Sequence, residues 1–158
     1  MRTHLVLAAL VLFLRLPAFS QMPDKPSGFV TDAARVIPAA DVKLLETRCA
    51  RIDQTHRAQI AIVIVSSLEG KPIEQATLEL FRKWGIGRKG IDNGIMLLLS
   101  VADRKSRLTV GYGLEHTISD SAAASILQKM QPDLRDGKYT SALNLALDSL
   151  EKLLPPSK

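Results

Sequence analysis

At 158 residues the chain has the length of one domain, and its hydrophobic share of 46% is sufficient to build a core. This composition excludes a disordered protein. The net charge of +5 is modest, and no run of Lys and Arg is interleaved with aromatic residues, so we predict no nucleic-acid partner.

The first 20 residues have the pattern of a secretory signal peptide. Arg2 gives a basic start, Leu5 to Leu14 is an unbroken apolar run, and Ala18-Phe19-Ser20 has the small-x-small form of a cleavage site. A bilayer span needs about 20 apolar residues, so a cleaved signal is favoured over the alternative, an uncleaved membrane anchor. We expect an exported protein, periplasmic or extracellular after cleavage near Ser20, with no transmembrane segment in the mature chain.

Hydrophobic periodicity and turn residues predict four elements in the N-terminal half. These are an extended lead-in over residues 21–27, a short extended piece over 28–32, a helix from Pro38 to about His56, and a strand over 59–65. The strand is apolar without alternation, which is typical of a strand covered on both faces. On the helix, the single cysteine, Cys49, lies on the apolar stripe and is predicted to be buried rather than reactive. Arg48 is predicted on the opposite, solvent-facing side.

The C-terminal half alternates strands and helices. The predicted elements are a helix from Pro72 to Gly85, a buried strand over 94–101, a hairpin turn at 103–105, an antiparallel strand over 107–112, a helix capped by Ser119 or Asp120 and ended by Pro132, a last helix over about 139–154, and a tail over 155–158. This order predicts one domain over residues 28–154. Its expected fold is a Rossmann-like three-layer α/β/α sandwich with a small mixed sheet.

The predicted topology separates the conspicuous acidic residues into two groups. Asp32 comes just before the first helix and Asp103 just after a strand, so both should lie near Ser66 and Ser67 at the end of the sheet where the parallel strands finish. Asp92, Asn93, Glu115 and Asp120 should lie at the opposite end. Asp92 and Asp103 are about 25 Å apart along the strand, so one ion cannot contact both. Open α/β sheets bind ligands beyond the carboxyl ends of their strands, which favours the first group, although the second is denser in acids.

Carboxylate ligands suit Ca²⁺, Mg²⁺ or Mn²⁺ rather than zinc. These acids also have structural explanations, because Asp92 lies in a turn before a strand, Asp103 lies in a hairpin and Asp120 can cap a helix. The glycines over residues 85–90 match a dinucleotide fingerprint, but they follow a helix and precede a strand, the reverse of the order that phosphate binding needs. No G-x-S-x-G motif of a serine hydrolase is present.

Four stretches resemble the TPM domain family, the thylakoid-lumen acid phosphatase-like proteins and their exported bacterial relatives. They read GFVTDAARVI, QIAIVIVSSLEG, FRKWGIGRKGIDNGIMLLLSVADRK and VGYGLEHTISD, and together cover most of residues 28–120. The resemblance implies an α/β/α sandwich, an acidic surface that takes a divalent cation, Ca²⁺ first, and an acid phosphatase activity in plant relatives, whereas other relatives are accessory or assembly factors. By position, the acidic residues of the family's motifs correspond to Asp32, Asp92, Asp103, Glu115 and Asp120 in this sequence. Arg35 stands where relatives usually have glycine, and Ser106 where they usually have an apolar residue.

Two functions remain open. The first is an exported accessory or binding module that holds a divalent cation and contacts envelope or membrane-associated partners. The second is a metal-assisted acid phosphatase, with Asp32 or Asp103 as metal ligand or base and Arg104 or Arg88 neutralising phosphate. The sequence offers no activated nucleophile, so the first function is favoured.

Overall fold

The computed structural model describes residues 22–156. Four strands form one sheet, β1 (Val30–Asp32), β2 (Gln59–Val65), β3 (Gly94–Ser100) and β4 (Lys105–Val110), in the order β1-β2-β3-β4. The first three strands are parallel and β4 runs antiparallel to β3. The small mixed sheet predicted from the sequence is confirmed.

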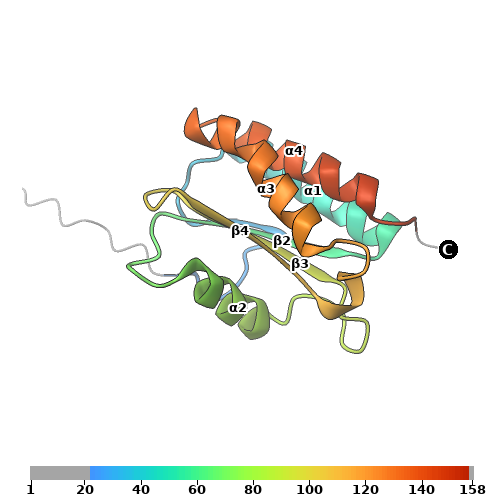
Figure 1. The fold of residues 1–158 in the computed structure, drawn as a ribbon. Helices are drawn as coiled ribbons and strands as arrows, with labels where there is room; N and C mark the ends of the chain where they lie inside the picture. Colours follow the sequence, from blue (N-terminus) through green and yellow to red (C-terminus); the bar gives the residue numbers. More distant parts are fainter. Residues whose placement is uncertain (1–21, 157–158) are drawn as a thin grey trace, which may run out of the picture.

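Helices cover both faces of this sheet (Figure 1). The helices α1 (Ala39–His56), α3 (Asp120–Arg135) and α4 (Tyr139–Leu153) lie on one face, and α2 (Ile73–Trp84) lies on the other. The α/β/α arrangement is therefore confirmed. No helix within residues 22–156 is long and apolar enough to cross a membrane.

The core is centred on β2 and β3, whose side chains alternate between the two layers. Ile62 and Leu97 are paired across the strands and pack with α1, α3 and α4, whereas Val63 and Leu98 pack with α2. Every residue of β3 is buried. Because both faces are covered, neither strand shows the apolar-polar alternation of a half-exposed strand.

The buried thiol of Cys49 belongs to the larger core, where its exposure is 0%. Burial raises the pKa of this thiol to about 12, so it stays protonated at neutral pH. The prediction that Cys49 is buried is confirmed.

The described part of the chain begins with the lead-in to the sandwich. The predicted signal peptide over residues 1–20 lies outside the described residues. The described part of the lead-in, 22–27, has no regular structure and is attached to α2. There the Lys83 side chain pairs with the Asp24 carboxylate, and Trp84 Nε1 donates to the Asp24 carbonyl at 3.2 Å.

Two boundaries differ from the sequence prediction. Pro132 does not end α3, which continues for one more turn to Arg135, because the Pro132 carbonyl accepts the Asp136 N–H at 3.1 Å and Leu134 packs on the core. The strand expected over 107–112 lies at 105–110 instead. Tyr112 lies in a short 3₁₀ helix (Tyr112–Leu114) and is 75% exposed.

Arg48 was predicted on a solvent face, and that prediction is wrong. Its side chain is only 17% exposed, and its guanidinium pairs with Asp148 and Glu151 of α4. It also donates to the Asn144 carbonyl at 3.2 Å. The sequence pattern of α1 shows which stripe is apolar but cannot show that α4 lies along its polar flank.

The edge strand β1 is attached to α1 through the Glu46 carboxylate. This group accepts the backbone N–H of Phe29 at 3.0 Å and that of Val30 at 2.7 Å. A Cβ atom at Gly28 would collide with the Glu46 carboxylate, so a larger residue there would displace the carboxylate from these two hydrogen bonds. The contact fixes the first residues of β1, the strand that ends at Asp32.

We expect Glu46→Ala to lower the free energy of unfolding by about 2 kcal/mol, because two backbone donors lose a charged acceptor. Chemical denaturation monitored by circular dichroism measures the change. Thr47→Ala, at the next and exposed position of α1, should change stability by less than about 0.5 kcal/mol. Equal effects of the two substitutions would contradict the role given to Glu46.

Candidate functional site

The carboxyl edge of the sheet, where β1, β2 and β3 end, is held together by Asp103. Its Oδ2 accepts hydrogen bonds from Ser100 Oγ at 2.5 Å, Leu68 N at 2.6 Å and Ser67 Oγ at 3.3 Å. These donors come from the end of β3 and from the segment after β2. The predicted meeting of Asp103 with Ser67 at this edge is therefore confirmed.

The hydrogen bonds also set the charge state of Asp103. The bond from Ser100, followed by the backbone bond from Leu68, holds the pKa of the Asp103 carboxyl below its ordinary value. An ionised carboxylate with three donors on one oxygen is a strong structural anchor. It is a weak base, because the same donors stabilise the charged form.

Asp32 ends β1 and is placed differently. Its Oδ2 accepts the Ile37 N–H at 2.7 Å, whereas its Oδ1 is buried and has no hydrogen-bond partner in the described structure. The loop that follows contains Arg35 at a φ of 56°, a left-handed conformation that glycine adopts more easily. The departure from the family pattern at Arg35 therefore falls on a position where the backbone itself would favour glycine.

Asp32 and Asp103 lie at the same edge but on different faces of the sheet. Asp32 is in register with Ile64, which packs in the core beneath α1, α3 and α4. Ser100, which holds Asp103, is in register with Val65, which packs against α2. Residues in register share a face. The two carboxylates therefore do not face each other across one common surface.

The remaining predicted ligands lie at the amino edge, where the parallel strands begin. Asp92, Glu115 and Asp120 are exposed there, and Gly113 N donates to the Asp92 carbonyl at 3.1 Å. The α3 cap is Ser119, whose Oγ accepts the Ala122 N–H at 3.3 Å. The division of the acids between the two edges follows the predicted topology.

Neighbouring Asn93 is buried and is used structurally. Its Oδ1 accepts the Arg88 N–H at 2.7 Å, and its Nδ2 donates to the Arg57 carbonyl. Arg88, one of the two arginines considered for phosphate, pairs instead with Asp53 at 2.7 Å. Its charge is therefore already balanced.

Across residues 22–156, no three of the His, Cys, Asp and Glu side chains gather as a metal-binding group. The donor set at Asp32 fits a divalent cation in one respect, since a buried carboxylate oxygen without a donor is a hard ligand available for coordination.

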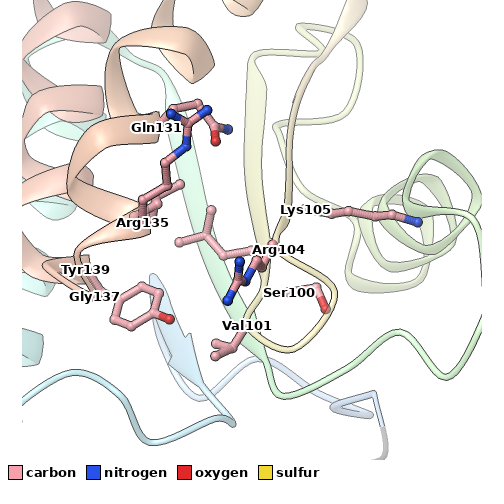
Figure 2. Close-up of a pocket in the computed structure, with 10 residues that line it drawn as sticks. Ser100, Val101, Arg104, Lys105, Gln131, Arg135, Gly137 and Tyr139 are labelled. Carbon is pink, nitrogen blue, oxygen red and sulfur yellow. The ribbon is translucent and has the colours of Figure 1, made fainter.

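A cavity of about 310 Å³ opens on the other side of the β3–β4 hairpin, between the hairpin and the end of α3. Figure 2 shows Arg104 entering from the hairpin and Arg135 from α3, with Gln131 and Tyr139 on the helical wall. A second hollow of about 560 Å³ adjoins it and shares Arg104, Lys105 and Gln131. Sequence reasoning identified Arg104 but missed Gln131, Arg135 and Tyr139. No motif links them to the hairpin.

The family comparison matches the TPM domain over residues 30–153. None of the curated proteins matches the chain.

Solved structures give the same picture of the fold. The N-terminal domain of a P. gingivalis protein, determined by NMR in solution, has 30% sequence identity and a TM-score of 0.73 over 79% of this chain and 80% of that one. The N-terminal domain of a Corynebacterium glutamicum protein has 16% identity and a TM-score of 0.67 over 87% of each chain. A protein of the psychrophilic bacterium Bizionia argentinensis has 14% identity and a TM-score of 0.63 over 77% of this chain and 86% of that one.

The Asp103 network predicts an acid dependence of stability. Its folded-state pKa lies below the unfolded value of about 4. Its contribution is therefore complete above that pH and is lost as the pH falls through the folded-state pKa. We expect Ser100→Ala to raise the pKa of Asp103 more than Ser67→Ala does, because the Ser100 bond is 2.5 Å and the Ser67 bond 3.3 Å. Carboxyl ¹³C NMR titration measures both, and the reverse order would contradict this assignment.

Proposed function

The chain belongs to the TPM domain family, and on that premise we propose that it is an exported accessory module that holds a divalent cation, Ca²⁺ first, and contacts envelope partners. The cation would bind at the carboxyl edge of the sheet, through Asp32. The signal-like pattern of the first 20 residues supports export. The buried Oδ1 of Asp32, which has no hydrogen-bond donor, is the observation that carries the cation proposal.

One carboxylate ligand predicts weak binding. Affinity for Ca²⁺ rises with the number of charged ligands and the rigidity of the site, and extracellular modules reach dissociation constants of about 10⁻⁴ to 10⁻³ M. A site with Asp32 as its one carboxylate belongs at the weak end of that range. Mg²⁺ and Mn²⁺ would use the same oxygen, with Mg²⁺ less readily dehydrated.

The phosphatase alternative has less support from the geometry. Asp103 is held by three hydrogen bonds and its pKa is lowered, which makes it a poor general base. Arg88 is paired with Asp53. Arg104 is still available to an anionic group, and Asp103 is its neighbour in the hairpin. That adjacency is what keeps a phosphatase as the second candidate.

We expect Ca²⁺ to raise the melting temperature of the protein. At 10 mM and a Kd of about 1 mM, a ligand that binds only the folded state adds about 1.4 kcal/mol, equivalent to about 4 °C for a domain of this size. Asp32→Asn should abolish the rise, because the amide still accepts the Ile37 N–H but presents NH₂ to the cation. Differential scanning fluorimetry with and without EDTA measures the shift.

The combined variant Asp92→Asn, Glu115→Gln and Asp120→Asn is the matched control, since it removes the acids of the amino edge. It should retain the rise. A shift lost in this variant but kept in Asp32→Asn would move the cation to the amino edge. Metal-dependent turnover of an aryl phosphate by the wild-type protein, lost in Asp103→Asn, would replace the accessory module with a phosphatase.

Export has a direct test. Mass spectrometry of the protein recovered from the producing cells should find a mature N-terminus close to residue 21. Recovery with residues 1–20 intact in a membrane fraction would instead support an uncleaved anchor.

A further inference from the structure

The cavity beside the hairpin carries an excess of positive charge. Three of its ten lining residues are cationic, Arg104, Lys105 and Arg135, and none is a carboxylate. Within residues 22–156, none of these three side chains takes part in an ion pair. The Arg104 and Arg135 side chains come from different walls of the cavity, whereas the Lys105 side chain points away from them toward α2 (Figure 2). The two guanidinium groups would therefore attract an anion that enters the cavity.

The carboxylates closest along the chain already have partners. Asp103 is held by Ser100, Leu68 and Ser67 on the α2 side of the sheet. Asp136 pairs with Lys138 at 2.8 Å. The charge of the cavity is thus not balanced by the acid that precedes Arg104 or by the one that follows Arg135.

The remaining lining residues suit an anion attached to an apolar group. The Gln131 amide and the Tyr139 hydroxyl can donate hydrogen bonds, and Leu99, Val101 and Leu134 supply apolar surface. The volume of about 310 Å³ is near the lower end of small-molecule sites, which begin at about 300 Å³. The cavity therefore has room for a small amphiphilic anion.

Arg104 occupies a position where its backbone would favour another residue. Its φ is 51°, and its N–H closes the turn on the Val101 carbonyl at 3.3 Å. Glycine is the usual residue at a left-handed position that ends a short hairpin turn. An arginine at this position does not stabilise the turn. Its guanidinium instead extends into the cavity from the wall opposite Arg135 (Figure 2).

We propose that the cavity between the β3–β4 hairpin and α3 is a binding site for an oxyanion, a carboxylate or a phosphate, carried on a small apolar group. Arg104 and Arg135 bind the anion from opposite walls. The guanidinium group matches both anions because it can donate two parallel hydrogen bonds. This site uses none of the five acids considered for the cation.

The test is an NMR titration of ¹⁵N-labelled protein in 150 mM NaCl with EDTA, so that a cation plays no part. Phenylphosphonate and benzoate are the probes, with benzyl alcohol as the uncharged analogue. We expect saturable shifts at the amides of residues 99–105 and 131–139, with a Kd of about 1 mM or lower. Tighter binding of phenylphosphonate identifies a phosphate ligand, and tighter binding of benzoate a carboxylate ligand. No saturable shift with either, or equal binding of benzyl alcohol, overturns the proposal.

Substitutions then assign the binding to the two arginines. Arg104→Gly and Arg135→Gln should each weaken binding about tenfold. Lys129→Gln removes the same charge from an exposed position on α3 and should leave the Kd unchanged. An equal loss in Lys129→Gln would show attraction by net charge alone and overturn the site.

Arg104→Gly also separates binding from folding. Because glycine suits the left-handed backbone at residue 104, the variant should melt at the same temperature as the wild type or higher while binding less well. If it melts lower, Arg135→Gln decides the proposal. Wild-type affinity in Arg135→Gln would then overturn it.

Discussion

The pairing of β2 with β3 is the constraint on which the rest of the structure depends. Seven residues of each strand are in parallel register, from Gln59 with Gly94 to Val65 with Ser100, and helices cover both faces. A polar side chain in the middle of such a pair would be buried without water, at a cost of several kcal/mol. Polar and charged residues are therefore confined to the two edges of the sheet. The separation of the acids into two groups follows from this.

The last residue of β3 shows how the constraint is met at the carboxyl edge. Ser100 is 3% exposed, and its hydroxyl is satisfied by the Asp103 carboxylate. The same carboxylate accepts the Leu68 N–H from the segment after β2. One acidic side chain thus closes the hairpin and joins it to the neighbouring strand. In doing so it fixes the residue that follows, Arg104, at the mouth of the cavity.

Much of the fold could be predicted from the sequence because its signals are local. Apolar runs without alternation indicated β2 and β3, and Pro38, Pro72 and Gly85 marked helix ends. The extra turn after Pro132 could not be predicted, because it depends on packing against the core.

The candidate site was harder to predict, because the face of the sheet on which a side chain lies changes with a register shift of one residue. Asp32 and Asp103 were expected to meet at one site. A shift of either residue by one position along its strand would move its side chain to the other face of the sheet. No local sequence pattern fixes which face a residue at the end of a strand takes. Arg135 and Tyr139 line the same cavity as Arg104 only because α3 and the start of α4 pack beside the hairpin. Sequence spacing carries no sign of that shared cavity.

The structure places Asp32 on the same face of the sheet as the cavity beside the hairpin, and not on the face of Asp103. Asp32, Ile64 and Leu99 are in register across β1, β2 and β3 and share one face, and Leu99 lines the basic cavity. Two strand spacings put Asp32 about 10 Å from Leu99. A cation at Asp32 and an anion in the cavity would attract by about 0.4 kcal/mol per pair of unit charges in water at that distance. Since about 8 to 10 Å is also the screening length at physiological salt, the attraction would be weaker still, and the two proposed sites should bind their ions almost independently.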